Sequence, residues 1–133
     1  MATIQLRRTE ELVENKRKIY KWYEERLANH PLIEMVKEKS DTFANYCYPS
    51  LFLSDEVTIP AVEVVAKLKE LNIHCRPGFP QMSNFPVYVA EKRFENPVAK
   101  RFSEKGIVLP AAHNIVEKDV DFVCKSLFEI IEI

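Results

Sequence analysis

Glycine is scarce in this chain, whose 133 residues include only Gly78 and Gly106. A glycine-rich loop that cradles a phosphate group is therefore excluded. The chain also lacks the GxSxG turn of serine hydrolases and the HExxH pair of zinc proteases. A cysteine and histidine pair stays open as a nucleophilic site, although Cys124 falls on an apolar helical stripe and is expected to serve the core.

Long hydrophobic runs and an excess of one charge are also absent. No apolar run approaches the roughly 20 residues of a membrane span, and the N-terminus lacks a signal-peptide core. The net charge of -1 argues against nucleic acid or an anionic membrane as a partner. With 47% hydrophobic and 29% charged residues, the composition is that of a single soluble globular domain over residues 1–133.

Cysteines are few, and their number is odd. They are Cys47, Cys75 and Cys124. None belongs to a CxxC pair, which favours reduced thiols in the cytoplasm over a disulfide framework. A metal site built from His74, Cys75 and His113 is not expected, because adjacent residues of a strand point to opposite faces.

A long amphipathic helix is predicted from about Thr3 to Asn29, a stretch without proline or glycine. Its apolar residues recur every seven positions, at Leu6, Val13, Tyr20 and Leu27. This spacing is typical of a helix that packs one face on a core, and a coiled-coil seam is the alternative. The helix should end before Pro31, since the residue preceding a proline is disfavoured in the α region.

The middle of the chain predicts short strands around a second helix. The expected strands are residues 32–36, 43–53 and 73–76. Pro49 within the second strand removes a donor of the strand ladder, which indicates an edge position or a bulge. Between the last two strands, Thr58 is expected to cap a helix that has Pro60 in its first turn.

The last third of the chain predicts a helix, a strand and a final helix. Asn96 followed by Pro97 is typical of a capped helix start, and Gly106 is expected to end that helix in a left-handed conformation. Residues 107–109 then predict a strand, and a helix from about Glu117 has apolar residues at helical spacing. The sum is an α+β fold, with a small and mostly antiparallel sheet covered on one face by helices.

A stretch of about twenty residues, 77–96, has no convincing periodicity, and such long loops are usually functional or disordered. Prolines within it and at its borders fix φ and reduce chain entropy. Three aromatic side chains, Phe79, Phe85 and Tyr88, are expected to anchor it. We therefore predict a rigid and ordered loop.

The lysines of the chain show no sign of a Schiff-base site. Such a site needs a lysine whose pKa is depressed by burial or by a neighbouring cation. The lysines here fall on solvated helix faces, among charged residues or at helix ends. None is expected to be a buried nucleophile.

Five stretches resemble the DegT family of aminotransferases. Residues 76–88, RPGFPQMSNFPVY, resemble a family loop of the approximate form R-P-F-F-x-P-L-H/S-x-x-P-x-Y. Residues 96–99, NPVA, and 106–110, GIVLP, resemble its P-V-A and G-I-x-L-P block, and 119–123, DVDFV, resembles its closing D-V-D-x-V helix. The first helix resembles the family's Q-L…R-R…Y…L helix. The resemblance covers nearly the whole chain in collinear order.

Members of that family are fold-type-I enzymes, usually dimers, that use pyridoxal phosphate to move an amino group from glutamate to a keto sugar on a nucleotide. Their Schiff-base lysine and cofactor-binding residues lie in a large domain, upstream of the helix with which this chain begins. The resemblance therefore implies a small C-terminal domain that supplies a substrate-facing wall and dimer surface. It implies that this chain alone binds no cofactor and catalyses no transamination. A stand-alone, non-enzymatic binding or dimerisation module is the alternative.

Four residues are candidate substrate contacts. Arg76 comes first, because a guanidinium suits a diphosphate or a carboxylate, with a surface ion pair as the alternative. Ser83 stands where many family members have histidine, and we expect it to reach a sugar hydroxyl unless it is an ordinary turn residue. Phe79 is expected to anchor the loop more than to stack on a ligand. His113 is expected to face the cleft.

Two further departures from the family pattern concern shape. Gly78 replaces a bulky aromatic residue, which would loosen or reshape the pocket. Val116 stands where a threonine often caps the last helix, so the cap is expected from Asn114.

The apolar stripe of the first helix would pack partly against the large domain of the family. Without that domain an apolar patch stays exposed, and such patches drive association. We therefore expect a concentration-dependent dimer or oligomer, which the substitution Tyr20→Glu should weaken.

Overall fold

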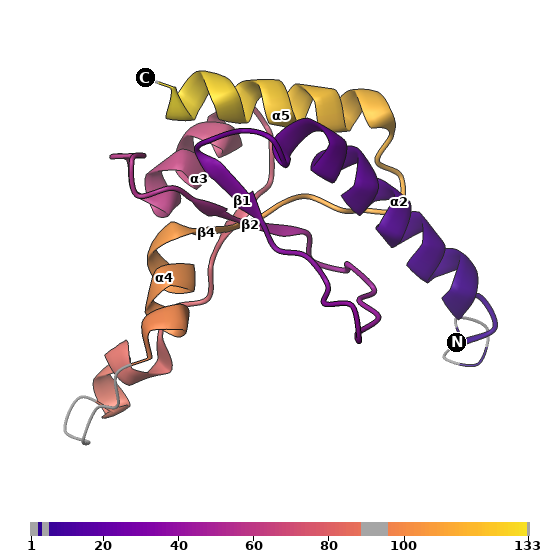
Figure 1. The fold of residues 1–133 in the computed structure, drawn as a ribbon, viewed down its shortest axis with the longest axis horizontal. Helices are drawn as coiled ribbons and strands as arrows, with labels where there is room; N and C mark the ends of the chain where they lie inside the picture. Colours follow the sequence, from indigo (N-terminus) through magenta and orange to yellow (C-terminus); the bar gives the residue numbers. More distant parts are fainter. Residues whose placement is uncertain (1–2, 4–5, 89–95, 133) are drawn as a thin grey trace.

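The computed structural model describes residue 3 and residues 6–88 and 96–132 (Figure 1). The helices are α2 (Thr9–Leu27), α3 (Ala61–Glu70), α4 (Pro97–Lys105) and α5 (Glu117–Ile131). The strands are β1 (Ile33–Met35), β2 (Ser50–Leu53), β3 (Arg76–Pro77) and β4 (Gly106–Val108). Two short 3-10 turns, Met82–Asn84 and Pro86–Tyr88, lie between β3 and α4.

The strands form one sheet in the order β1-β2-β4-β3, and each neighbouring pair is antiparallel. Side chains alternate along β2, where Leu51 and Leu53 are buried and Phe52 is half-buried. Helices α2, α3 and α5 cover the face of Leu51 and Leu53 (Figure 1). Helix α4 lies on the other face, where the ring of Phe102 packs edge-on against Phe52. The predicted α+β class with a small antiparallel sheet is confirmed.

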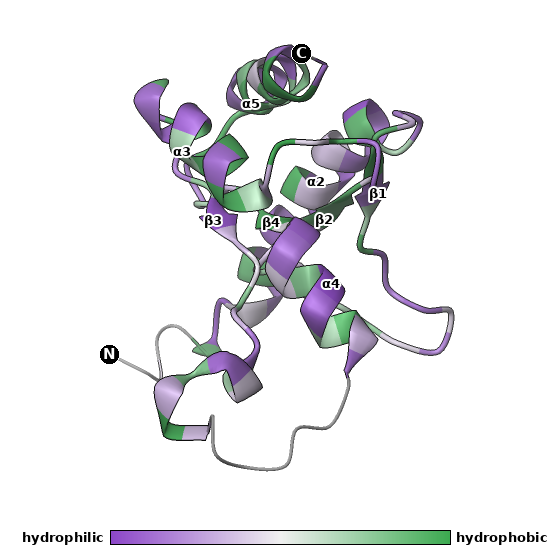
Figure 2. Ribbon diagram, turned by 90° about the vertical axis from the view of Figure 1, so that its left-hand side faces the viewer, coloured by the Kyte–Doolittle hydropathy of each residue, from purple (hydrophilic) through white to green (hydrophobic). Residues whose placement is uncertain are grey.

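The core joins the C-terminal half of α2 to α3, α5 and the sheet. Ile19, Tyr23 and Leu27 are fully buried and recur once per helical turn, as predicted for the helix over 3–29. The Tyr23 hydroxyl donates a hydrogen bond to the Pro110 carbonyl at 2.9 Å, so the polar atom of this buried ring is satisfied. Figure 2 shows hydrophilic and hydrophobic segments on each helix, as amphipathic helices require.

Strand β2 is shorter than predicted. It comprises only Ser50–Leu53, and residues 36–49 form a long connection from β1. Pro49 is buried and lies just before the strand, not inside it. Tyr46 has a positive φ of 49°, a left-handed backbone that is incompatible with an extended strand. The predicted strand is therefore wrong over 43–49.

One predicted helix cap is wrong and another is confirmed. Helix α3 begins at Ala61 directly after Pro60, and no side chain caps it, so Thr58 does not have the predicted role. Proline is tolerated there because its missing N–H would have no partner within the first helical turn. At α4, Asn96 Oδ1 accepts a hydrogen bond from the Ala99 N–H at 3.1 Å, as predicted.

The start of α5 uses a different partner from the one expected. Val116 occupies the capping position, and its side chain has no polar atom. The Val116 N–H donates a hydrogen bond to Asp119 Oδ2 at 2.9 Å, which is one half of a capping box. The predicted role of Asn114 as the cap is therefore wrong.

Gly106 begins β4 and does not end α4 in a left-handed conformation, since its φ is -78° and its ψ is 138°. Glycine is required at this position because there is no room for a side chain. A Cβ added at Gly106 would overlap the carbonyl oxygen of Phe102, and a Cβ added at Gly78 would overlap the same oxygen. The two glycines of the chain thus allow the end of α4 to approach the sheet.

The loop predicted over 77–96 is described as far as Tyr88, and residues 89–95 lie outside the described residues. The exposed fractions are 80% for Phe79, 44% for Phe85 and 43% for Tyr88. These rings are not buried against the domain, so the predicted anchoring is wrong. Figure 1 shows the segment extending away from the sheet, beyond the start of α4. We refer to residues 79–88 as the projecting arm.

Candidate functional site

Arg76 lies on β3, at one edge of the sheet, where it pairs with Val108 of β4. Strand β3 begins at this residue, later than the predicted strand over 73–76. The Arg76 side chain is exposed. Within the described ranges no carboxylate forms an ion pair with it, unlike Arg8, Arg17, Arg26 and Arg101. The alternative of a surface ion pair therefore finds no partner among these residues.

The projecting arm leaves the sheet directly after β3. Its root is held in place, because the Gly78 N–H donates a hydrogen bond to the Gly106 carbonyl at 2.8 Å. Ser83 is half-buried in the first 3-10 turn of the arm, and Phe79 is exposed near its start. Arg76, Phe79 and Ser83 therefore belong to one continuous segment at the sheet edge.

The glycine at position 78 allows close packing at the root of the arm. An added Cβ would overlap the Phe102 carbonyl oxygen and lie 2.8 Å from the Phe102 carbonyl carbon. A larger residue would therefore require α4 to move away from β3. The structure thus shows a tight contact at Gly78, whereas the expected loosening or reshaping of a substrate pocket stays a prediction.

His113 lies apart from the other three candidates. It is exposed in the linker between β4 and α5, next to Asn15 of α2. Asn15 Nδ2 lies 3.1 Å from His113 Nδ1 and donates a hydrogen bond to the His113 carbonyl at 3.1 Å. Figure 1 shows this linker beside α2, on the opposite side of the molecule from the arm. The four predicted contacts thus do not form one site within this chain.

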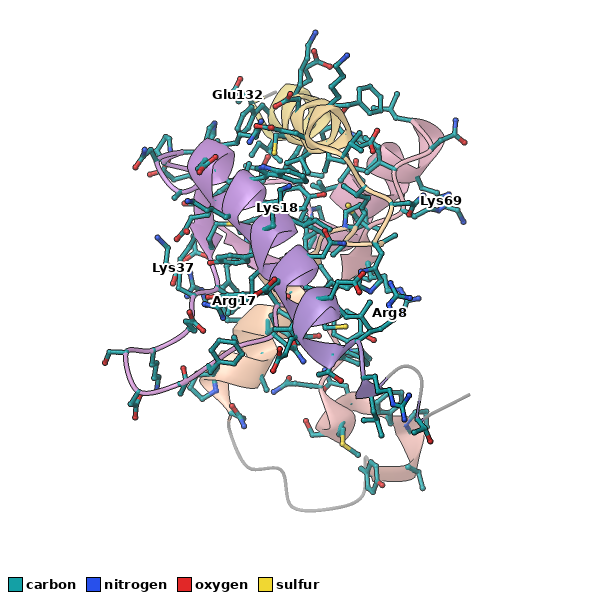
Figure 3. All side chains as sticks on the ribbon, turned by 90° about the vertical axis from the view of Figure 1, so that its right-hand side faces the viewer. Arg8, Arg17, Lys18, Lys37, Lys69 and Glu132 are labelled. Atoms are coloured by element: carbon teal, nitrogen blue, oxygen red, sulfur yellow. The ribbon has the colours of Figure 1, made fainter. Side chains whose placement is uncertain are left out.

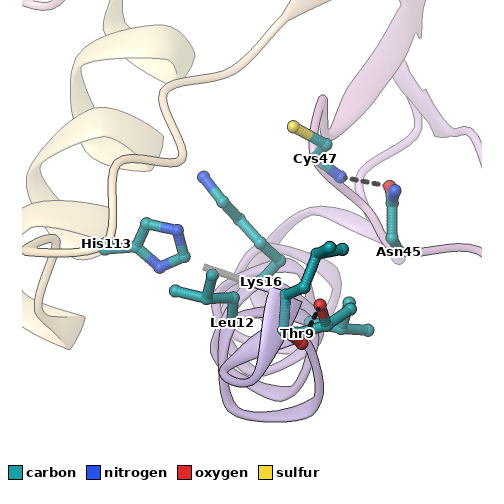
Figure 4. Close-up of a pocket in the computed structure, with 8 residues that line it drawn as sticks. Thr9, Leu12, Lys16, Asn45, Cys47 and His113 are labelled. Carbon is teal, nitrogen blue, oxygen red and sulfur yellow. Dashed lines mark hydrogen bonds between the residues drawn. The ribbon is translucent and has the colours of Figure 1, made fainter. Parts of the chain in front are cut away.

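A groove that the sequence analysis missed lies beside the N-terminal half of α2 (Figure 4). Its volume is about 480 Å³, and most of its lining is apolar. Helix α2 forms the floor, and the β1–β2 connection and the β4–α5 linker form the two sides. Its lining includes Leu6, Leu12, Val13, Lys16, Cys47 and His113. We refer to it as the α2 groove. The sequence did contain a signal of this groove, because Leu6 and Val13 of its lining are the first two members of the seven-residue apolar repeat.

Polar groups at the α2 groove already have partners. The Lys16 ammonium donates a hydrogen bond to the Ala111 carbonyl, and His113 contacts Asn15. No buried side-chain nitrogen or oxygen lacks a hydrogen-bond partner in the part of the chain that the structure describes. The groove therefore offers apolar surface and not a set of converging polar groups.

A cluster of polar groups holds the β1–β2 connection against α2. Arg17 projects from α2 toward this connection (Figure 3) and donates hydrogen bonds to the Glu38 carboxylate at 2.6 and 2.9 Å and to the Ala44 carbonyl. The Glu38 carboxylate also accepts the Ala44 N–H at 2.7 Å. The hydrogen bonds from Arg17 and then from Ala44 lower the pKa of Glu38 to about 2. We refer to Arg17, Glu38 and Ala44 as the Arg17 clasp.

Aromatic contacts surround the clasp. The rings of Tyr46 and Tyr20 stack with 3.6 Å between their centroids, and the Tyr46 hydroxyl accepts the Glu38 N–H at 3.0 Å. The Arg17 guanidinium lies 4.5 Å from the centroid of the Phe43 ring. These contacts fix a connection that has no regular secondary structure of its own.

The lysine and cysteine side chains of the described residues offer little reactive chemistry. No lysine that the structure describes is buried, so these residues do not fit the covalent attachment of pyridoxal phosphate, which needs a lysine activated by its surroundings. Burial raises the pKa of the Cys75 and Cys124 thiols to about 12, which keeps both protonated at neutral pH. Over the described ranges, no three His, Cys, Asp or Glu side chains group as a metal site. None of the described helices combines the length and the apolar composition that a membrane span requires.

Comparison with curated proteins identifies a relative over nearly the whole chain. GDP-perosamine synthase of Escherichia coli O157:H7 is 26% identical over 125 residues, which are 94% of this chain and 33% of that protein. The chain thus spans about one third of the length of this relative.

Comparison with solved structures gives the same fold. PseC of Helicobacter pylori, an aminotransferase of pseudoaminic acid biosynthesis, matches with a TM-score of 0.84 at 14% identity, over 98% of this chain and 35% of that one. DesI, solved in the presence of its TDP-sugar product, matches with a TM-score of 0.83 at 22% identity, over 92% of this chain and 32% of that one. At such identities the likeness establishes the fold alone.

A sequence model of one protein family matches residues 1–128, nearly the whole chain. That family is the one that the segments 76–88, 96–99, 106–110 and 119–123 resemble. The chain belongs to the DegT/DnrJ/EryC1/StrS aminotransferase family.

Proposed function

We propose that this chain is the small C-terminal domain of a pyridoxal-phosphate-dependent aminotransferase that acts on a keto sugar linked to a nucleotide, and that it does not transaminate alone. The observation that carries the proposal is the family match over residues 1–128 in a chain that spans about one third of its relatives. When bound in the full enzyme, the cofactor supplies the amino-group chemistry. This domain would contribute surface that contacts the substrate and the rest of the enzyme.

Two relatives support a nucleotide sugar as the substrate class. One is named for GDP-perosamine, and the other was solved with a TDP-sugar. In this chain, Arg76 is the residue best suited to a nucleotide diphosphate, because its guanidinium is exposed at a sheet edge. Ser83, on the adjoining arm, would meet a sugar hydroxyl. His113 lies against α2 and is not part of this proposed wall.

The first experiment tests the cofactor. Pyridoxal phosphate is titrated into the purified chain, the mixture is reduced with borohydride, and the products are mapped by mass spectrometry. We expect no stoichiometric adduct at a single lysine, because no described lysine is buried. The E. coli relative serves as the positive control. A complete adduct at one lysine of this chain would refute the proposal that it lacks the catalytic centre.

The second experiment tests the substrate wall. UDP, GDP and TDP are titrated separately into the isotopically labelled chain, and amide chemical shifts are recorded. A charge-assisted contact is worth about 1.5–3 kcal/mol, so Arg76→Gln should weaken the fitted affinity by about tenfold or more. Arg101→Gln is the control, since Arg101 is already paired with Glu34. Equal losses in the two variants would contradict a specific role for Arg76.

A further inference from the structure

Helix α4 lies on the sheet without a fully buried residue of its own. None of its 9 residues is buried, and Phe102 is only half-buried where its ring packs edge-on against Phe52. A helix of this length is marginal alone, and an element with few buried apolar contacts opens more easily than the core. Polar contacts therefore have a large share in holding α4 in place.

Lys105, the last residue of α4, fastens the helix to the turn that follows β2. Its ammonium donates a hydrogen bond to the Val57 carbonyl at 3.0 Å and a longer one to the Ser54 carbonyl at 3.5 Å. Hydrogen bonds from a charged donor are stronger than neutral ones. The ammonium also lies at the C-terminal end of α4, where the helix dipole favours a cation.

The turn over residues 54–57 is itself fixed. The Val57 N–H donates a hydrogen bond to the Ser54 carbonyl at 3.1 Å, and the Ser54 N–H donates one to the Leu32 carbonyl, beside β1, at 2.9 Å. The Val57 side chain is buried in the core. Because both acceptors of Lys105 belong to this backbone, they cannot follow a displaced helix. Lys105 therefore restricts where α4 can lie.

The ion pair of α4 is less constraining. Arg101, one turn before Lys105, pairs with Glu34 of β1 at 2.6 Å, and its guanidinium lies 4.5 Å from the centroid of the Phe52 ring. The side chains of this pair are 47% and 62% exposed, and such pairs contribute little because water and salt screen them. The contacts of Lys105 therefore constrain the end of α4 more than this ion pair does.

The projecting arm has contacts with both ends of α4. At the C-terminal end of the helix, the Gly78 N–H donates a hydrogen bond to the Gly106 carbonyl at 2.8 Å, and the Phe102 carbonyl packs closely against both glycines. At the N-terminal end, Gln81 Nε2 donates a hydrogen bond to the Asn96 carbonyl at 3.3 Å. Figure 1 shows the arm continuing beyond the start of α4. The direction of the arm thus depends on where α4 lies.

We propose that Lys105 is a positioning residue for the projecting arm. Its ammonium fixes α4 on the 54–57 turn, and α4 in turn fixes the direction of the arm, which carries Ser83. Lys105 touches no substrate in this proposal and acts only through the helix. The proposal deepens the proposed function and rests on it for the role of the arm as a substrate wall. The direction of the arm itself depends on no ligand.

Amide hydrogen exchange in the full chain measures how firmly the root of the arm is held. Lys105→Met keeps the length of the side chain but removes its hydrogen bonds. Loss of a charge-assisted hydrogen bond should raise the exchange rate of the Gly78 amide by about tenfold or more, because displacement of α4 exposes that amide to water. The amide of Leu127, whose side chain is fully buried in the core, should change much less. Lys105→Arg retains a charged donor and should restore slow exchange at Gly78.

The distance between two spin labels measures the direction of the arm. One label is attached at Met82→Cys in the arm and the other at Lys125→Cys on α5, and both positions are exposed. The exposed Cys47 is replaced by serine. Burial raises the pKa of the Cys75 and Cys124 thiols to about 12, which keeps both unlabelled at neutral pH.

The distribution of label distances should respond to Lys105 specifically. We expect Lys105→Met to broaden this distribution, because a loosened α4 leaves the arm with more than one direction. Lys105→Arg should narrow the distribution again. Lys100→Met makes the same substitution at an exposed position of the same helix. It is the matched control and should leave the distribution unchanged.

Two results would overturn the proposal. One is equal acceleration of exchange at Gly78 and at Leu127 in Lys105→Met, which would indicate a general loss of stability. The other is the same distance distribution in Lys105→Met and in Lys100→Met. If Lys105→Met does not fold, Lys105→Leu gives the same two readouts. Neither readout requires a ligand, so failure of the proposed substrate leaves this test intact, and failure of this test leaves the proposed function standing.

Discussion

Replacing Gly78 by alanine tests how closely α4 approaches the sheet. Gly78 is buried, and its backbone φ is not positive, so an L-residue is permitted by conformation alone. Space is the obstacle, because the added Cβ would overlap the Phe102 carbonyl oxygen and lie 2.8 Å from its carbonyl carbon. Both atoms belong to the backbone and cannot rotate away. The end of α4 would have to shift.

Two opposing contributions decide the sign of the change. Overpacking costs about 1–3 kcal/mol, and contact with backbone places this case near the upper value. Alanine also reduces the entropy of the unfolded chain, which stabilises by about 0.4–1 kcal/mol. The net loss is about 2 kcal/mol, which lowers the melting temperature of a domain of this size by roughly 6 °C. The steric contribution therefore wins.

Thermal unfolding followed by circular dichroism measures this change. Val98→Ala, at an exposed position of the same helix, is the control and should stay within about 0.5 kcal/mol. Both glycine substitutions are repeated in a Phe102→Ala variant. This variant distinguishes contacts with the Phe102 backbone from contacts with its ring, because the clash at Gly78 involves backbone atoms. At Gly106, by contrast, ring atoms of Phe102 also lie 2.6 and 2.8 Å from the added Cβ. Phe102→Ala should therefore relieve Gly106→Ala partly and Gly78→Ala hardly at all. A Gly78→Ala protein as stable as the wild type would refute the reasoning.

Three other substitutions have defined outcomes. The pKa of Glu38 is lowered from 4.5 to about 2 on folding, so its ion pair stabilises the fold above pH 4.5 and is lost as the pH falls toward 2. The difference in melting temperature between wild type and Glu38→Gln should thus close over that interval, and a constant difference down to pH 2 would contradict this. Asn96→Ala should lower the free energy of unfolding, measured in urea, by about 1 kcal/mol because it removes the α4 cap, whereas Asn96→Asp keeps the cap. Equal losses of stability in the two variants would argue against the cap. Leu27→Ala, at a fully buried position, should cost about 2–5 kcal/mol, and an unchanged urea midpoint would exclude its place in the core.

The helices could be predicted because their signals are local. The stripe over 3–29 and the final stripe from Glu117 both have helical spacing, and packing on the core agrees with that spacing. Asn96 and Pro97 are adjacent, so the start of α4 was contained in two neighbouring residues. Pattern, capping and packing point to the same answer in these places.

The β1–β2 connection could not be predicted, because contacts distant in sequence determine it. Residues 43–53 are rich in aromatic and apolar side chains, which locally favour a strand. Arg17 overrides that preference by binding Glu38 and Ala44. The role of Gly106 could not be predicted for the same reason, because glycine at this position allows α4 to approach the sheet closely and does not end a helix. Local patterns do not contain such contacts.

The candidate site was predicted in part. Sequence placed Arg76, Phe79 and Ser83 in one segment, and the structure keeps them together. The sequence did not indicate where His113 lies, because its position depends on how the β4–α5 linker crosses α2. The stripe residue Tyr20 was expected to face an exposed patch, but it is buried and stacked on Tyr46. Tyr20→Glu would therefore damage the core, and Leu6 is the better probe of association.

Exposed apolar residues give a physical argument that this domain makes further contacts. Single exposed hydrophobic residues are ordinary on protein surfaces. Here, however, Phe43 and Phe79 sit on segments that hydrogen bonds fix at their bases, in the Arg17 clasp and at Gly78. Both rings stay in solvent in this arrangement, although burial would gain about 25 cal/mol per Å². A fixed segment that keeps an apolar ring in solvent is what the proposed role as one domain of a larger enzyme predicts.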